Sequence, residues 1–297
     1  MKAAPFAYHR PESVADAVAL LREYGDEAKI LAGGQSLVPM LAMRLTHFEN
    51  LIDISRIEEV RNIELRDGAV WIGAGTPHAF VGMDDEVAES VPLLTLSTPH
   101  IGHFQIRTRG TLGGAIAHAD PAAEYAAVAV ALDAEIEATS ARGTRRIPAA
   151  DFFTGLWETS LAADEVLTAV AFPVWSGRCG FSVHEFARRH GDFAIAGATL
   201  GVELDEDDTV LRCGIGLLGM GSTPVRGTPA ESAIVGRPVG DISAEEIGKL
   251  AISELEDVPA DLQGSAAYRS RVCATMVARA WTEATTAAVE TREAIHA

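Results

Sequence analysis

Two pairs of adjacent glycines, each beside hydroxyl or amide side chains, are the residues of this sequence best suited to binding a ligand. The first pair lies in 31–40, which reads LAGGQSLVPM, and the second lies in 107–115, which reads RTRGTLGGA. Glycine has no Cβ, so its backbone can adopt positive φ and a ligand can approach its N–H groups closely. Two such segments would bind an extended diphosphate from both sides. The first pair alone fits a tight turn before a helix equally well.

Three other patterns resemble functional sites but fit them poorly. Gly214–Gly219 has the G-x-G-x-x-G spacing of a dinucleotide fingerprint, yet Gly221 and Pro224 interrupt the helix that must follow, so we predict a closely packed, glycine-rich strand. Gly34-Gln35-Ser36 begins like a hydrolase nucleophile elbow, but Val38 stands where the elbow has glycine. The last pattern is a group of side chains that we interpret as a polar loop rather than a metal site: His100, His103, His118 and Asp120.

Hydrophobic periodicity and turn residues predict an α+β protein in two parts. The Pro/Gly-punctuated stretch 173–177 separates a domain at 1–175, with subdomains at about 1–55 and 56–175, from a sheet-and-helix domain at 178–290. The opening has a β-α-β-α-β order. Helices are expected at 14–24, 38–45, 121–132, 244–255 and 267–286, and strands at 29–32, 50–54, 69–72, 134–138, 165–172, 180–188, 196–204 and 209–218.

Composition excludes several classes of function. The formal net charge of −18 over 297 residues argues against a nucleic-acid partner and against binding to anionic lipid. No apolar run reaches the length of a membrane span, and the N-terminus lacks the apolar region of a secretory signal, so we expect a cytoplasmic protein without a membrane span. The three cysteines, Cys179, Cys213 and Cys273, are far apart, whereas an iron–sulfur cluster uses about four thiolates, so we expect free thiols and no metal.

Taken together, the motifs resemble those of one family. AGGQSL at 32–37, HIGHFQIRTRGTLGGAIAHADPAAE at 100–124, RRHGDFAIAG at 188–197 and SAAYRSRV at 265–272 are similar to the FAD-binding medium subunit of the molybdenum hydroxylases. The aerobic carbon monoxide dehydrogenase medium subunit and the flavin domain of xanthine dehydrogenase belong to this family. The resemblance runs in order along nearly the whole chain.

The resemblance implies a PCMH-type (vanillyl-alcohol-oxidase-like) FAD-binding fold at 1–175 and a CO dehydrogenase flavoprotein-like α+β domain at 178–290. It also implies that FAD is bound non-covalently, with residues 32–37 around the pyrophosphate and residues 111–115 on its other side. Four single residues are implied as further contacts: a carboxylate, Glu124; an apolar ring contact, Leu161; a polar contact, His184; and an aromatic near the ring, Phe193. The implied cofactor-binding residues are Ala32, Gly33, Gly34, Gln35, Ser36, Leu37, Thr111, Leu112, Gly113, Gly114, Ala115, His118, Glu124, Leu161, His184 and Phe193. Thr108 and His184 depart from the Asn and Lys usual in the family.

In such enzymes a large subunit oxidises the substrate at a molybdopterin, and a small subunit carries two [2Fe–2S] clusters. The resemblance therefore implies an electron-transfer subunit that passes electrons to quinone, NAD or oxygen within a dimer of heterotrimers. No side chain need act as a catalytic acid, base or nucleophile, because the redox chemistry belongs to the cofactor. Two alternatives stay open: an autonomous PCMH-type flavoprotein oxidase, and a non-enzymatic scaffold subunit that has lost FAD.

Overall fold

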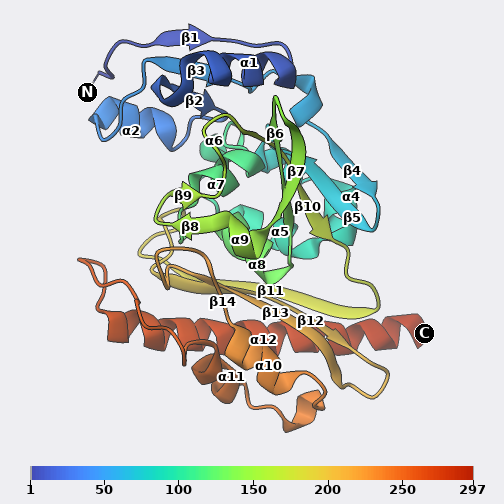
Figure 1. Ribbon diagram of the computed structural model, residues 1–297. Helices are drawn as coiled ribbons and strands as arrows, with labels where there is room; N and C mark the ends of the chain where they lie inside the picture. The colour runs from blue at the N-terminus through green and yellow to red at the C-terminus, as the bar shows by residue number, and fades with distance from the viewer. Residues whose placement is uncertain (1, 297) are drawn as a thin grey trace.

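The computed structural model describes residues 2–296, and side-chain contacts and burial refer to residues 2–290. The three larger of the four sheets in the described residues define three units, named here by their strands: an N-terminal unit (strands within 7–53), a middle unit (strands within 63–173) and a C-terminal unit (strands within 178–226). The N-terminal unit and the C-terminal helix α12 lie at opposite ends of the molecule, with the middle unit between them (Figure 1). The fold is α+β, as predicted.

The N-terminal unit is a parallel three-stranded sheet in the order β1-β3-β2. Its first helix begins where the sequence predicts, because the Ser13 side chain accepts a hydrogen bond from Asp16 N at 3.1 Å. Ala17, Val18 and Leu21 form the buried face of that helix. The predicted β-α-β-α-β order is confirmed, with elements β1 (Ala7–His9), α1 (Val14–Tyr24), β2 (Ala28–Leu31), α2 (Leu37–Met43) and β3 (Asn50–Asp53).

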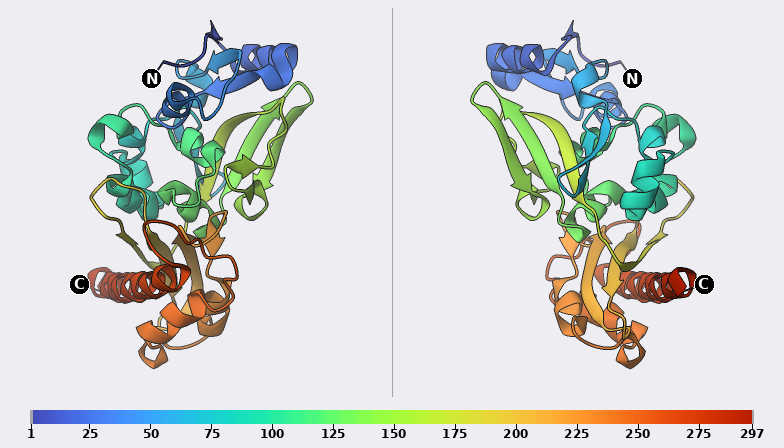
Figure 2. Two further views of the ribbon diagram at one scale, coloured as in Figure 1. Left: turned by 90° about the vertical axis from the view of Figure 1, so that its left-hand side faces the viewer. Right: turned by 90° about the vertical axis from the view of Figure 1, so that its right-hand side faces the viewer.

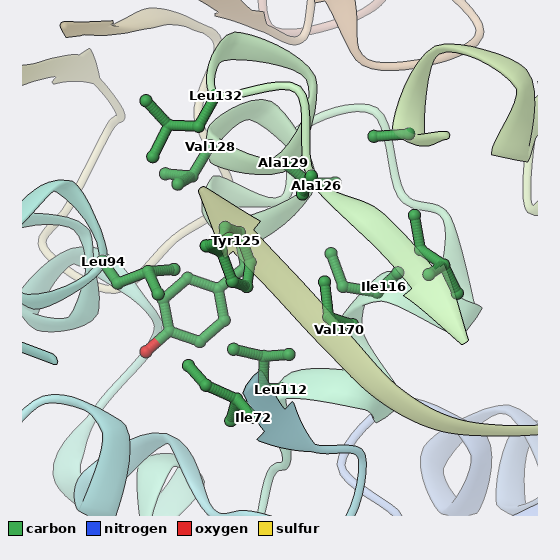
Figure 3. Packing of buried hydrophobic residues seen from close by; sticks show 14 of the residues in the cluster. Ile72, Leu94, Leu112, Ile116, Tyr125, Ala126, Val128, Ala129, Leu132 and Val170 are labelled. Atoms are coloured by element: carbon green, nitrogen blue, oxygen red, sulfur yellow. The ribbon is translucent and has the colours of Figure 1, made fainter. Parts of the chain in front are cut away.

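The middle unit is built on an antiparallel five-stranded sheet in the order β4-β5-β10-β6-β7. Helix α8 is almost entirely buried, and Tyr125 inserts its ring between Leu94, Leu112 and Val170 (Figure 3). The elements are β4 (Ile63–Arg66), β5 (Ala69–Gly73), α3 (His78–Val81), α4 (Asp85–Ser90), α5 (Pro92–Ser97), α6 (Phe104–Arg107), α7 (Leu112–His118), α8 (Glu124–Ala131), β6 (Glu135–Ser140), β7 (Gly143–Pro148), α9 (Ala149–Phe152), β8 (Phe153–Gly155), β9 (Glu158–Thr159) and β10 (Val166–Pro173).

The C-terminal unit is an antiparallel four-stranded sheet in the order β11-β12-β13-β14, with the 31-residue helix α12 lying across it (Figures 1 and 2). Hydrophobic side chains of α12 and of β12 and β13 form one buried cluster. The elements are β11 (Arg178–Phe186), β12 (Ala196–Leu204), β13 (Val210–Leu218), β14 (Val225–Arg226), α10 (Thr228–Ile234), α11 (Ala244–Ala251) and α12 (Ala266–His296).

The sheet of the C-terminal unit is held between α12 on one face and α8 of the middle unit on the other. A Cβ on Gly214 or Gly216 would overlap the carbonyl oxygen of Ala131 or Ala127, so these glycines let β13 approach the α8 backbone. The prediction that the G-x-G-x-x-G pattern is a closely packed strand is therefore confirmed.

Several predicted helices differ from the structure in their bounds, since the helix expected at 244–255 ends at Ala251 and the one expected at 267–286 extends over Ala266–His296. The helix expected at 121–132 begins only at Glu124, because the Asp120 side chain accepts from Ala122 N at 2.9 Å and forms a turn before it. The second glycine pair lies inside α7, a helix that the sequence patterns did not predict. No helix in the described part of the chain is long and apolar enough to cross a bilayer.

Candidate cofactor-binding site

The first glycine pair forms the turn between β2 and α2. Gly34 has a φ of 72°, in the left-handed region, and the Gln35 side-chain amide donates to Gly33 O at 3.2 Å. The backbone N–H groups of Gly33, Gly34, Gln35 and Ser36 donate to no acceptor within residues 2–296. Successive N–H groups around a left-handed residue make a concavity that binds anions. This segment therefore fits a diphosphate.

The second glycine pair has a different backbone arrangement. Thr111 is the N-cap of α7, and its hydroxyl accepts from Gly114 N at 3.1 Å. The backbone N–H groups of this segment are not available to a diphosphate as those of the first segment are, because they already have protein acceptors: Leu112 N donates to Thr76 O at 3.0 Å, Gly113 N to Ala74 O at 3.0 Å and Ala115 N to Thr111 O at 3.0 Å.

The two glycine segments nevertheless lie close to each other. A Cβ on Gly33 would overlap the carbonyl oxygen of Arg109 and would lie 2.6 Å from Gly110 Cα. A Cβ on Gly114 would lie 3.5 Å from Ala32 Cβ. The N-terminal unit thus approaches the chain just before α7 through backbone contact, and glycine is the residue that permits it.

His118 lies at the other end of α7, beyond the glycines. Its ring is nearly parallel to that of Trp157, at an angle of 11° and a centroid separation of 6.2 Å. Burial lowers the pKa of His118, with Lys29 acting in the same direction and Asp120 against it. A neutral imidazole at this position can donate or accept a hydrogen bond without adding charge.

Glu124 is the first residue of α8 and is close to a second carboxylate, Glu185 of β11. Burial raises the pKa of Glu124 to about 8, and the negative charges of Glu185 and Asp120 act in the same direction. Glu185 Oε1 lies 3.3 Å from His100 Nδ1, and its buried Oε2 has no hydrogen-bond partner in the described part of the chain. The predicted carboxylate thus lies near other acidic side chains where the middle and C-terminal units meet.

The remaining predicted contacts lie in three different settings. Leu161 is partly buried and packs on the core of the middle unit. Phe193, in the loop between β11 and β12, is 62% exposed. His184 lies on the face of β11 that meets α12, where its Nε2 is 2.7 Å from Glu283 Oε2. The structure does not bring His184 together with the glycine segments, whereas the next residue, Glu185, faces the middle unit.

The polar residues weighed as a metal site have other partners. His100 faces Glu185, and the ring of His103 lies 6.0 Å from that of His190. Among residues 2–290, no group of three or more His, Cys, Asp or Glu side chains is arranged to hold a metal ion. Thr108, one of the departures from the family pattern, donates its hydroxyl to Gln105 O at 2.9 Å and so stabilises the turn after α6.

Sequence reasoning missed two residues that the structure places beside the predicted ones, Glu185 and Trp157. Because successive side chains of a strand point to opposite faces of the sheet, the position of Glu185 next to His184 in β11 would have placed it on the other face. Trp157 lies in a short hairpin with too few residues to show a period.

Comparisons with known proteins cover nearly the whole chain. The family model described as the FAD binding domain in molybdopterin dehydrogenase matches residues 4–175. The model of the CO dehydrogenase flavoprotein C-terminal domain matches residues 181–284.

Individual relatives agree with these matches. The chain is 39% identical over 295 residues to the 6-hydroxypseudooxynicotine dehydrogenase complex subunit alpha of Paenarthrobacter nicotinovorans, covering 99% of both proteins. It is 35% identical over 275 residues to the carbon monoxide dehydrogenase medium chain of Hydrogenophaga pseudoflava, covering 93% of this chain and 95% of the relative.

Solved structures show the same fold. A structure of carbon monoxide dehydrogenase from Hydrogenophaga pseudoflava matches with a TM-score of 0.93 at 35% identity, covering 97% of this chain and 99% of that one. Quinoline 2-oxidoreductase from Pseudomonas putida 86 matches with a TM-score of 0.91 at 32% identity, covering 97% and 99%. The resemblance seen in the motifs is confirmed, and the chain belongs to the family of FAD-binding medium subunits of the molybdopterin dehydrogenases.

Proposed function

We propose that this chain is the electron-transfer subunit of a molybdenum hydroxylase and that it holds a non-covalent FAD between its N-terminal and middle units. When bound, FAD would supply the redox chemistry of electron transfer between the iron–sulfur clusters of a partner and quinone, NAD or oxygen. The observation that carries the assignment is the row of four N–H groups at 33–36 that have no acceptor among the described residues. Such donors are suited to a diphosphate.

The proposed roles of this chain are to bind and orient the cofactor. Residues 32–37 would hold the pyrophosphate, and Thr111 to Ala115 would shape the opposite wall through their close backbone approach. His118, Glu124, Leu161 and Phe193 would line the further part of the site. His184 remains a proposed contact that must turn away from Glu283 to reach the ring.

We further propose that the working enzyme contains two other subunits, a large one with molybdopterin and a small one with two [2Fe–2S] clusters, assembled as a dimer of heterotrimers in the cytoplasm. The family match supports the partners. The cysteine content supports the division of labour, because three free thiols are fewer than one cluster uses. Substrate choice would then belong to the large subunit.

The test is to purify the chain with its flavin and compare it with the complete complex. We expect acid precipitation to release unmodified FAD, and we expect the flavin of the isolated chain to stay oxidised when organic substrates are added. In the complex the same substrates should bleach the flavin. Substrate-driven bleaching in the isolated chain would overturn the proposal in favour of an autonomous oxidase, and a chain that binds no FAD would favour the scaffold alternative.

A further inference from the structure

The β8–β9 hairpin carries an exposed aromatic tip beside the proposed cofactor site. Leu156 and Trp157 are 55% and 54% exposed. The base of the hairpin is fixed, since Ser160 N donates to Phe152 O at 2.8 Å and the Phe153 ring packs edge-on against Phe152 at 5.2 Å. The tip is therefore presented by a rigid support.

The backbone at this tip is held in an unfavourable conformation. Trp157 has a φ of 58°, and the residue between His118 and Asp120, Ala119, has a φ of 54°. A left-handed conformation costs a non-glycine residue on the order of 1 kcal/mol, and such residues gather where a precise side-chain direction is needed. Neither residue is an Asn or Asp, which tolerate this region, so two strained turns meet at one place.

The strained turns bring three side chains together. The Trp157 ring lies nearly parallel to the His118 ring, and Trp157 Nε1 points to Asp120 Oδ2 at 3.4 Å, a weak hydrogen bond. These contacts aim the indole plane while leaving half of the side chain open. An oriented, exposed aromatic plane is a surface on which another planar ring can stack.

The position of Trp157 along the site fits one end of the ligand. Helix α7 has seven residues and spans about 10 Å, from the glycine contact at its start to His118 at its end. If the diphosphate lies at residues 33–36, the ribityl chain that joins it to the isoalloxazine ring would span a length similar to that of α7. We propose that Trp157 is a cofactor-contact residue whose indole stacks on the isoalloxazine ring of the bound FAD. This inference rests on the proposed function.

The first experiment compares the affinities of flavin and adenine ligands for three variants. FAD, FMN and ADP are titrated separately into wild type, Trp157→Ala, Trp157→Phe and Leu156→Ala. Trp157→Ala should raise the dissociation constants of FAD and FMN about tenfold, the effect of losing one stacked aromatic ring, and should leave that of ADP unchanged. Trp157→Phe should restore most of the affinity, and the matched control Leu156→Ala should bind all three ligands like wild type.

A second measurement keeps the inference falsifiable if a variant folds poorly. FMN should quench a component of the intrinsic tryptophan fluorescence in wild type, and this component should be missing in Trp157→Phe, whose other three tryptophans remain. If Trp157→Ala binds FAD and FMN as tightly as wild type does, the inference is overturned while the proposed function stands. The same holds if Trp157→Ala loses affinity only for ADP, which would place the adenine ring at the tip. Failure of wild type to bind FAD would overturn the proposed function and this inference together.

Discussion

Residues 32–37 and 111–115 look alike in the sequence, because each places two adjacent glycines beside a hydroxyl residue, but they differ in the structure. In the first segment the N–H groups of 33–36 have no acceptor within residues 2–296. In the second, the N–H groups of residues 112–115 donate hydrogen bonds to the Thr111 hydroxyl and to nearby carbonyl oxygens. One segment therefore offers hydrogen bonds to a ligand, whereas the other supplies shape.

Each segment also contains one glycine whose missing side chain is required by packing against backbone or a neighbouring Cβ. A Cβ on Gly33 would overlap Arg109 O, and a Cβ on Gly113 would overlap Ala74 Cβ. Gly34 instead has a positive φ and only side-chain atoms nearby, Val38 Cγ2 at 3.1 Å and Leu31 Cδ1 at 3.2 Å. Gly33 and Gly34 are therefore required for different structural reasons, and substitutions can distinguish the two.

The largest effect should come from breaking the contact between the segments. Gly33→Ala should destabilise the chain by about 3 kcal/mol or more, because backbone atoms of Arg109 and Gly110 cannot yield as a flexible side chain can. Urea unfolding of the flavin-free chain measures this. The control is Gly240→Ala, where nothing lies within 4 Å of the added Cβ. Equal stabilities of the two variants would show that the segments do not meet.

The next effect concerns the carboxyl that follows the second segment. Because the folded-state pKa of Glu124 is raised to about 8 from its usual 4.5, its contribution to stability is present below about pH 4.5 and is lost as the pH rises through 8. Glu124→Gln should therefore gain stability over wild type at pH 8, by at least tenfold in the unfolding equilibrium constant, and much less at pH 5.

Chemical denaturation at the two pH values checks this prediction. Glu64→Gln, which removes an exposed carboxylate with a side chain 52% accessible, serves as the control and should show no such difference. A gap between Glu124→Gln and wild type that does not depend on pH would mean that Glu124 is not held as a neutral acid.

A smaller effect sharpens the contrast between the two helix starts. Thr111→Ala should cost about 1 kcal/mol, because it removes the acceptor of Gly114 N. Ser36→Ala should change stability by less than about 0.5 kcal/mol, since Ser36 makes no side-chain cap. Thermal unfolding of the two flavin-free variants compares them directly, and similar losses would contradict the difference in capping.

The sequence predicts well those elements whose own residues carry the pattern. Ser13 marks the start of α1, and β12 occupies 196–204 as expected, because it is a short run of mostly small and apolar residues that is buried on both faces. Helix α7 escaped prediction since its two glycines weaken the helical pattern, and tertiary contact with Ala74 decides their conformation. The short helices α3 to α6 have four to six residues each, too few for a period to appear.

The candidate site likewise contains one part that the sequence predicts and other parts that depend on tertiary structure. The motifs point to 32–37 as a ligand-binding backbone, and the free N–H groups agree with that prediction. Which way a side chain of β11 faces depends on how the strand packs in the sheet, so the family resemblance implied His184, whereas the strand directs Glu185 toward the middle unit. The position of the Trp157 side chain depends on a turn with positive φ, which no local sequence pattern predicts.

The central claim is that the N–H groups around Gly34 bind the diphosphate of FAD, and a pair of matched substitutions tests it. Gly34 and Gly68 have nearly the same φ, 72° and 73°, but Gly68 lies in the β4–β5 turn with nothing within 4 Å. Alanine at either position carries the same backbone strain. The measurement is the dissociation constant of FAD for Gly34→Ala, Gly68→Ala and wild type by absorption and fluorescence titration. We predict a rise of tenfold or more for Gly34→Ala alone, and equal affinities for all three proteins would contradict the account.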